Sequence, residues 1–384
     1  SGGVLRLPCR YRKGGRLKRA VPACSDPPRR IPKSEAFHRL IPDPTFSLLV
    51  SAMRALRFER FGEPADVLHV ATVPVADPHK NQVRVRMRLA PVNPSDLMVV
   101  RGRYGKLPTL PATPGFEGMG VVEHSGGGML PWLRGLKPGR RVAVVSGEGG
   151  TWQESIVVSA RNVIPLPDAI PDEQGASFFV NPVTALVLTR HVLRLRPGSV
   201  LLQTAAGSSL GRMIDRLSRH QGFRVINVVR RRDQANELEA GGAWKVICTE
   251  DESMVESAMA YSGGHGVDCA IDCVGGRTSF DALRCVAPGG KLVVYGTLSG
   301  EPVPLEPREL MTHGKSVEGF WLGPWVHGQG PLTMLRLFRQ VKRLIQANVL
   351  TSPAGTTFPL DRFADAMREA DRPGRPGKTL LRLE

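Results

Sequence analysis

The feature that most constrains the fold is a regular alternation of short apolar segments and amphipathic segments from residue 199 onward. The apolar segments have the length and composition of buried strands, and the amphipathic segments have helical spacing. This order is typical of a doubly wound parallel sheet. The predicted strands are SVLLQTAA (199–206), RVINVVR (224–230), KVICT (245–249), VDCAIDCVGG (267–276) and GGKLVVYGT (289–297), and the first two helices between them are SSLGRMIDRLSRHQG (208–222) and RDQANELEAGG (232–242).

The chain before residue 165 has a different pattern. From Met53 to Ile164, short strand-like runs are separated by Gly and Pro, and in one run Val83, Val85 and Met87 alternate with arginines. A period of two predicts strands with one buried face. This half of the chain therefore predicts a compact, barrel-like β domain.

The C-terminal part of the chain is predicted to return to this β domain. Before the first of the strands listed above, a helix is expected over 175–195. After the last of them, helical spacing is shown by Leu332, Leu335, Phe338, Val341 and Ile345. A closing strand, KTLLRL (378–383), follows. A chain of 384 residues with 41% apolar content is long enough for two cores. The predicted regions are an extension (1–52), a catalytic β domain (53–180), a nucleotide-binding domain (181–320) and a return segment that completes the catalytic domain (321–384).

The net charge of +17 is concentrated at the N-terminus. Residues 1–52 hold 11 Lys and Arg against three Asp and Glu, which is +8 of the total. This unpatterned, Arg- and Pro-rich segment predicts a disordered extension, either a targeting segment or translated upstream sequence with Met53 as the natural start. The rest contains no nucleic-acid-binding motif and no apolar run long enough for a membrane span, so neither partner is expected.

Six cysteines at positions 9, 24, 248, 269, 273 and 285 show no C-x-x-C spacing. They predict neither a disulfide framework nor a zinc knuckle, and they favour a reducing compartment. The expected location is cytoplasmic, or the mitochondrial matrix if residues 1–52 are a transit peptide.

A dinucleotide site is predicted where LLQTAAGSSLGRMI joins a strand to a helix. Gly207 and Gly211 let the backbone approach a pyrophosphate, which the N–H groups at the start of the helix can hold. The next strand ends in Arg230, Arg231 and Arg232, where NAD-dependent folds have an acidic residue. Three guanidinium groups beside the ribose site favour a 2′-phosphate, so NADPH is the predicted cofactor.

Together, these β and doubly wound domains resemble the medium-chain dehydrogenase/reductase superfamily over residues 53–384. The resemblance implies an α/β fold with a GroES-like β-barrel catalytic domain and a Rossmann doubly wound parallel sheet. The zinc branch has Gly-His-Glu where this chain has Gly115-Phe116-Glu117, and no cysteine lies between Cys24 and Cys248. We therefore expect no metal, and we interpret Glu117 as a structural carboxylate.

Two zinc-free branches remain, the NADPH quinone reductases and the mitochondrial-type 2-enoyl thioester reductases. Both are similar to this chain around VNPSDLMVVRGRYG (92–105), whereas VNPVTA (180–185), INVVRRR (226–232) and GFWLGPW (319–325) favour the enoyl reductases. Two departures are Arg231, where relatives have Asp, and Gly-Ser-Ser-Leu-Gly, where they commonly have Asn-Ser-Gly-Val-Gly. The resemblance implies cofactor contacts at Asn181, Gly207, Ser208, Ser209, Leu210, Arg230, Arg231, Arg232, Tyr295, Gly296, Phe320, Trp321, Leu322 and Lys378.

The same resemblance implies that Tyr104, Asn181 and Trp321 are catalytic residues. Reduction of an enoyl thioester needs a hydride at the β-carbon, stabilisation of the enolate oxygen and a proton at the α-carbon. The phenol of Tyr104 suits the last two tasks, Asn181 would orient the nicotinamide or the tyrosine, and Trp321 would wall the pocket. Alternatively, Tyr104 packs against the neighbouring prolines, Asn181 caps a helix and Trp321 belongs to the core.

The expected function is thus NADPH-dependent reduction of a small-molecule or carrier-bound trans-2-enoyl thioester. The alternatives are an NADPH:quinone or activated-alkene oxidoreductase and a catalytically silent NADPH-binding protein. A homodimer through edge strands of the nucleotide-binding domain is implied by the resemblance. His313 and His327 are expected at the surface.

Overall fold

In the computed structural model, residues 52–375 and 377–384 are described. The chain divides into two units, residues 1–48 and 49–384, and all described residues belong to the second. The predicted extension therefore lies outside the described residues except for Ala52, which begins strand β1 (Ala52–Arg57). Within the described residues, no helix is both long enough and apolar enough to cross a membrane.

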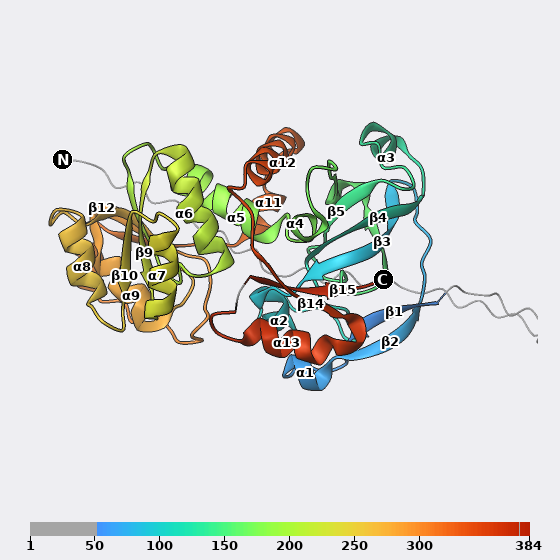
Figure 1. Ribbon diagram of the computed structural model, residues 1–384, viewed down its shortest axis with the longest axis horizontal. Coiled ribbons are helices and arrows are strands. Elements are labelled where there is room, and N and C mark those ends of the chain that lie inside the picture. The colour runs from blue at the N-terminus through green and yellow to red at the C-terminus, as the bar shows by residue number, and fades with distance from the viewer. Residues whose placement is uncertain (1–51, 376) are drawn as a thin grey trace, which may run out of the picture. The chain divides into compact units, whose positions relative to one another are not determined.

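The second half of the chain forms a six-stranded, entirely parallel sheet (Figure 1). Its strand order, β10-β9-β8-β11-β12-β13, is the order of dinucleotide-binding sheets, which confirms the predicted Rossmann domain. Neighbouring residues of β8 enter different cores: Leu201 belongs to the larger cluster and Leu202 to another. Both faces are therefore covered, as the near-continuous apolar strands predict. The strands are β8 (Val200–Gln203), β9 (Arg224–Val229), β10 (Lys245–Cys248), β11 (Val267–Asp272), β12 (Val286–Val294) and β13 (Ser316–Gly319), and the helices are α6 (Ser209–Gln221), α7 (Arg232–Ala240), α8 (Met254–Tyr261), α9 (Gly276–Arg284) and α10 (Pro307–Met311).

The first half of the chain supplies five strands of a seven-stranded sheet, whose order is β14-β15-β3-β4-β5-β7 with β6 paired to β3. In β3, buried Val83, Val85 and Met87 alternate with more exposed arginines, which confirms the expected period of two. The strands are β3 (Gln82–Pro91), β4 (Glu117–Ser125), β5 (Arg141–Val145), β6 (Ser155–Ser159), β7 (Val163–Pro165), β14 (Ala354–Pro359) and β15 (Lys378–Arg382), and β1 pairs separately with β2 (His69–Pro74). The helices of this half are α1 (Pro64–Val67), α2 (Pro94–Val100), α3 (Met129–Leu133) and the 3₁₀ turn η1 (Ala160–Asn162).

The C-terminal segment joins this seven-stranded sheet. β15 pairs antiparallel with β3, with Leu381 opposite Ala90, and α13 (Phe363–Asp371) packs beside it. The 3₁₀ turn η3 (Leu360–Arg362) precedes α13. The closing strand thus lies where the sequence predicts, and the exact domain boundaries stay a prediction.

The helix predicted over 175–195 is interrupted. The chain forms α4 (Asp172–Ala176), then α5 (Val180–Val187), and continues as the π-helical η2 (Leu188–Val192). The backbone N–H groups of Phe179 and Val180 donate to the carboxylate of Glu117, at 2.8 and 3.0 Å, instead of continuing a helix from α4. The side chain of Glu117, the first residue of β4, therefore sets where α5 begins.

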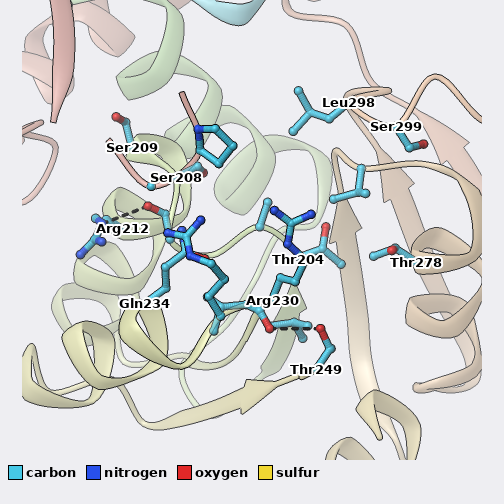
Figure 2. A pocket seen from close by; sticks show the side chains of 18 of the residues that line it. Thr204, Ser208, Ser209, Arg212, Arg230, Gln234, Thr249, Thr278, Leu298 and Ser299 are labelled. Atoms are coloured by element: carbon cyan, nitrogen blue, oxygen red, sulfur yellow. Dashed lines mark hydrogen bonds between the residues drawn. The ribbon is translucent and has the colours of Figure 1, made fainter. Parts of the chain in front are cut away.

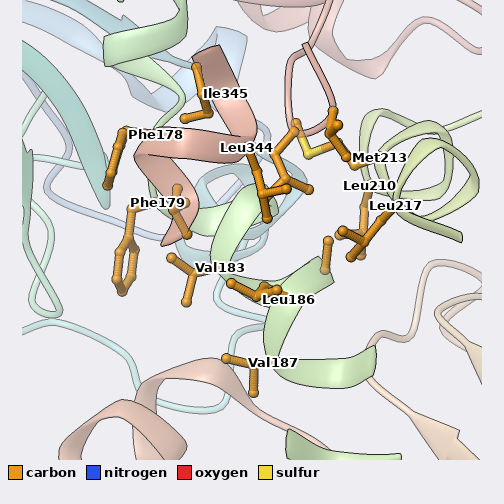
Figure 3. Packing of buried hydrophobic residues seen from close by; sticks show 14 of the residues in the cluster. Phe178, Phe179, Val183, Leu186, Val187, Leu210, Met213, Leu217, Leu344 and Ile345 are labelled. Carbon is orange, nitrogen blue, oxygen red and sulfur yellow. The ribbon is translucent and has the colours of Figure 1, made fainter. Parts of the chain in front are cut away.

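The largest hydrophobic core lies where α5, α6 and α12 (Pro331–Gln346) meet (Figure 3). Phe178 and Phe179 face α12 near Ile345, while Met213 and Leu217 of α6 pack on its other side. Phe338, Val341 and Ile345 are buried as their spacing predicts, whereas Leu332 and Leu335 are exposed. α11 (Leu322–His327) precedes α12.

Candidate active site

A cavity of about 1160 Å³ opens at the carboxyl edge of the parallel sheet (Figure 2). Its lining comes from the loop after β8, the end of β9, the loops after β11 and β12, and the residues that precede β15. The strand order reverses at β8, between β9 and β11, and this switch point is where doubly wound sheets bind dinucleotides.

The loop between β8 and α6 has the features of a phosphate site. The Ser208 hydroxyl caps α6 by accepting the N–H of Gly211 at 3.1 Å. A Cβ on Gly211 would lie 2.5 Å from the carbonyl oxygen of Ala206, so glycine is required for the helix to begin this close to the strand. Gly207, Ser208 and Ser209 line the cavity, and Leu210 is buried behind them. A capped helix N-terminus binds anions, so this loop fits the pyrophosphate of a dinucleotide.

The three consecutive arginines after β9 take different directions. Arg230 lines the cavity and forms no ion pair with any residue the structure describes (Figure 2). Arg231 also lines it, but its guanidinium pairs with Asp233 at 3.1 Å. Arg232 pairs with Asp251 and is not part of the lining. The structure therefore brings two of the three arginines to the cavity and leaves one of them free of an acidic partner.

Four more predicted cofactor residues follow the last two parallel strands. Tyr295 and Gly296 come directly after β12, and Phe320 and Leu322 come after β13. The backbone N–H of Tyr295 donates to the backbone carbonyl of Asp272 at 2.8 Å, and that of Phe320 donates to the backbone carbonyl of Val294 at 2.8 Å. These bonds hold both segments at the carboxyl edge of the sheet.

Tyr104 and Trp321 meet although they are 217 residues apart. The indole N–H of Trp321 donates to the Tyr104 hydroxyl oxygen at 2.9 Å, and the two rings are nearly perpendicular with centroids 5.5 Å apart. The other side of the phenol packs against Phe116, at 5.3 Å between centroids. Burial raises the pKa of Tyr104, and the charge of Asp96 adds to this, while the bond from Trp321 opposes it. The phenol therefore keeps its proton at neutral pH.

A buried polar cluster consists of Asn93, Asp96, Glu117 and Lys378. The amine of Lys378 donates to the Asn93 side-chain oxygen, and the Asn93 amide donates to Glu117 at 3.1 Å. Asp96 accepts the backbone N–H groups of Asn93 at 2.8 Å and Phe116 at 3.0 Å. The structural interpretation of Glu117 agrees with these contacts. The amine of Lys378 forms its hydrogen bond inside this cluster, whereas the neighbouring residue Gly377 lines the large cavity.

Glu117 also positions Asn181. The Glu117 carboxylate accepts the N–H groups of Phe179 and Val180, which begin α5, so Asn181 lies in the first turn of that helix. Its side chain forms no hydrogen bond with the residues that the structure describes, and Thr184 is buried one turn later. The helix-cap alternative for Asn181 is wrong, because residue 179 is the cap.

Burial dominates the electrostatics of the cluster. It raises the pKa of Asp96 to about 7 and also raises that of Glu117, although Lys378 opposes both shifts. Burial lowers the pKa of the Lys378 amine to about 8, against the attraction of Glu117. The cluster is therefore sensitive to pH near neutrality.

Asp96→Asn is expected to flatten the dependence of stability on pH between about 4 and 7. A carboxyl with a raised folded-state pKa binds more protons folded than unfolded in this window, so the wild-type protein loses stability as the pH rises. We expect a loss of about 2–4 kcal/mol that is absent from the variant, measured as the free energy of unfolding in urea. The exposed Asp66→Asn is the control, and equal slopes for all three proteins would contradict the prediction.

Sequence reasoning missed Asn93, Asp96 and Arg375. The first two form a capping box at the start of α2, and their Asn-x-x-Asp spacing could have predicted this helix start from the sequence. Arg375 lines the large cavity, donates to the carbonyl of Ala370, and has a buried Nε without a partner among the described residues. No local pattern marks Arg375, because only the return of the chain brings it to the nucleotide-binding domain.

Two other predictions concern metal ligands and surface histidines. In the described part of the chain, no group of three or more His, Cys, Asp or Glu side chains is arranged to hold a metal ion. Cys269, Cys273 and Cys285 are buried, and burial raises the pKa of each thiol to about 12. His313 and His327 are exposed, as expected.

Comparison with known proteins agrees with both halves of the fold. Residues 79–168 match the alcohol dehydrogenase GroES-like domain, and residues 209–339 match the zinc-binding dehydrogenase family. The mitochondrial enoyl-[acyl-carrier-protein] reductase of Bos taurus is 32% identical over 380 residues, which cover 98% of each chain.

Solved structures named for quinone reduction are also similar. The putative NADPH:quinone reductase of Bacillus thuringiensis is 33% identical, with a TM-score of 0.81 over 87% of this chain and 99% of that one. The Escherichia coli quinone oxidoreductase in complex with NADPH is 25% identical, with a TM-score of 0.79 over 86% and 99%. The chain therefore belongs to the medium-chain dehydrogenase/reductase superfamily of oxidoreductases, where it is similar to the mitochondrial enoyl-[acyl-carrier-protein] reductases.

Proposed function

We propose that this protein is an NADPH-dependent reductase of trans-2-enoyl thioesters carried by CoA or an acyl carrier protein. The observation that carries the proposal is the hydrogen bond from Trp321 to the Tyr104 hydroxyl oxygen. Enoyl-[acyl-carrier-protein] reductase is also the name of relatives that align with most of the chain. The guanidinium of Arg230, which lines the large cavity and has no acidic partner among the described residues, supports NADPH as the cofactor.

The bond from Trp321 sets how Tyr104 acts. Because the indole N–H occupies a lone pair of the phenol oxygen, the phenol proton points to a different acceptor. NADPH, when bound, supplies the hydride that adds to the β-carbon, and the electron pair of the double bond then moves to form an enolate. Tyr104 donates a hydrogen bond to the enolate oxygen and gives its proton to the α-carbon, directly or through water. The indole N–H then stabilises the phenolate that remains.

The remaining residues position these groups. Glu117 fixes the start of α5 and so the place of Asn181, which orients the nicotinamide amide. Trp321 is 42% exposed, so its ring is available to cover the reacting carbons and exclude water. Gly207, Ser208 and Ser209 hold the pyrophosphate, and Arg230 binds the 2′-phosphate.

Quinone reduction is the second candidate function. It is favoured by the solved structures at 33% and 25% identity that are named quinone reductases. A quinone accepts the hydride in the same place, but its reduction needs no proton at a carbon atom.

The two functions are distinguished by NADPH oxidation with crotonyl-CoA, a longer trans-2-enoyl-CoA and 1,4-benzoquinone, offered in parallel. The first proposal expects both thioesters to be turned over with kcat/KM at least about tenfold above that for the quinone. Turnover of benzoquinone alone would assign the chain to quinone reduction. No turnover of any of the three with NADPH bound would favour the silent NADPH-binding alternative.

Two features of cellular context remain proposals. The relatives are named mitochondrial, and the alignment with the Bos taurus protein covers 98% of this chain, so it includes most of residues 1–52. Both facts support the mitochondrial matrix over the cytoplasm. A homodimer would use β10 or β13, which are the two edges of the parallel sheet.

A further inference from the structure

One helical turn of the β domain presents an apolar face to solvent. In α3, the side chains of Met129, Trp132 and Leu133 are 73%, 78% and 62% exposed. Their spacing of three and four residues places them on one side of the turn. Figure 1 shows α3 at the outer edge of the β domain, beyond β4 and β5. Large apolar side chains grouped on a surface in this way mark an interaction site more often than scattered ones do.

The opposite side of α3 is anchored to the domain. Pro131 is buried and Leu130 packs against the core of the β domain. At the start of the turn, Gly128 has a φ of 105°, and a Cβ there would lie 2.4 Å from the side-chain oxygen of Asn81. α3 is therefore held in place with its apolar face outward.

Four cations lie near one another where the chain leaves α3 and along α12, and we name them the basic cluster: Arg134, Arg140, Arg339 and Lys342. Arg134 follows α3 directly and donates to the carbonyls of Ala160 and Arg161, at 2.7 and 3.0 Å. Lys342 of α12 is half-buried beside the three arginines, and burial and their charges lower its pKa. α12 itself contains no acidic residue.

The charge of the basic cluster is not neutralised locally. Within residues 52–375 and 377–384, no acidic side chain forms an ion pair with any of its four members. Like charges held together without a counter-ion create a positive field that attracts an anionic surface. The apolar face adjoins the basic cluster at Arg134, which directly follows Leu133 in the chain.

We infer that α3 and the basic cluster form a docking surface for the headgroup region of an anionic phospholipid membrane. The cations would bind lipid phosphates, while Met129, Trp132 and Leu133 would enter the boundary with the acyl chains, where tryptophan is favoured. A membrane fits better than an acidic protein, because three protruding apolar side chains need an apolar medium, and an acidic protein surface complements only the cations. This inference does not depend on the substrate proposed above.

The test uses the full chain and vesicles of phosphatidylglycerol and phosphatidylcholine with brominated acyl chains, which quench nearby tryptophan. Residues 1–52 are basic and can attract anionic vesicles, so the readout is insertion of Trp132. The variant Trp132→Phe identifies its contribution. Met129→Ser/Leu133→Ser removes apolar contacts and keeps the reporter, and Arg140→Glu/Arg339→Glu reverses two exposed members of the basic cluster. The matched control Arg60→Glu/Arg196→Glu makes the same change in net charge elsewhere, at two exposed arginines.

We expect quenching by the mixed vesicles, little quenching by phosphatidylcholine alone, and loss of the signal in Trp132→Phe. Both double variants of the surface should weaken the partition by about tenfold or more, while the Arg60/Arg196 control and the NADPH oxidation rate of every variant stay unchanged. Absence of Trp132 quenching would overturn the inference. An acyl carrier protein that shields Trp132 when vesicles do not would assign the surface to an acidic protein. Dissociation of a dimer in Met129→Ser/Leu133→Ser would assign it to a second copy of the chain.

Discussion

Tyr104→Phe is expected to lower kcat for an enoyl thioester by about 10²–10³-fold and to leave the Kd of NADPH unchanged. Phenylalanine keeps the ring that packs against Phe116 and Trp321, so the pocket retains its shape. The variant loses only the hydroxyl that receives the Trp321 N–H and holds the transferable proton. Single-turnover oxidation of NADPH with crotonyl-CoA measures the effect on the chemical step.

Two further variants test whether the loss has this cause. Trp321→Phe removes the indole N–H but leaves the phenol, so a smaller loss of about tenfold is expected. Tyr261→Phe is the matched control, because that phenol lies against Lys245 in the nucleotide-binding domain. If Tyr104→Phe retained the wild-type kcat with the thioester, Tyr104 would be a packing residue and the quinone proposal would gain support.

Arg230→Ala is expected to raise the Kd of NADPH by about 10–100-fold and to change that of NADH by less than about threefold. The reason is that the variant loses the contact between the guanidinium and the 2′-phosphate, which NADPH carries and NADH lacks. Arg232→Ala removes the same guanidinium two residues later, from a side chain that Asp251 holds outside the cavity lining. This matched control should leave both dissociation constants near the wild-type values, as measured by fluorescence titration.

The pair of variants also tests the interpretation of the arginine run. An equal loss of NADPH affinity in Arg230→Ala and Arg232→Ala would mean that Asp251 releases Arg232 when the cofactor binds. No loss in either variant would place the 2′-phosphate elsewhere. Arg375 is then the first residue to replace, because its buried Nε has no partner in the described chain.

The success of the fold prediction has a local origin. Strand and helix periods are properties of neighbouring residues, so β8, β9 and α6 lie close to their predicted positions. The interrupted helix around 175–195 shows the limit of this reasoning. Its residues have helical spacing, but the start of α5 is decided by Glu117, 62 residues earlier in the chain.

The candidate site divides in the same way. Gly207 and Gly211 lie within one turn between a strand and a helix, and their pattern predicts a phosphate loop directly. Arg375 has no such pattern, since it reaches the cavity only because β15 returns to β3. The exposure of α3 could not be predicted from the sequence either. Its residues, MLPWL, have the composition of a core segment, and only the tertiary structure shows which of them face solvent.

The sequence by itself determined the two kinds of domain and the glycine-rich turn between β8 and α6, because these depend on spacing along the chain. Tertiary structure alone decided that Trp321 donates to Tyr104 and that Lys378 joins Asn93 inside the β domain. It also decided that Arg232 is paired with Asp251 while Arg230 has no acidic partner among the described residues. The physical reason is that a hydrogen bond or ion pair forms between atoms within a few ångströms. Only the packing of distant segments sets those distances.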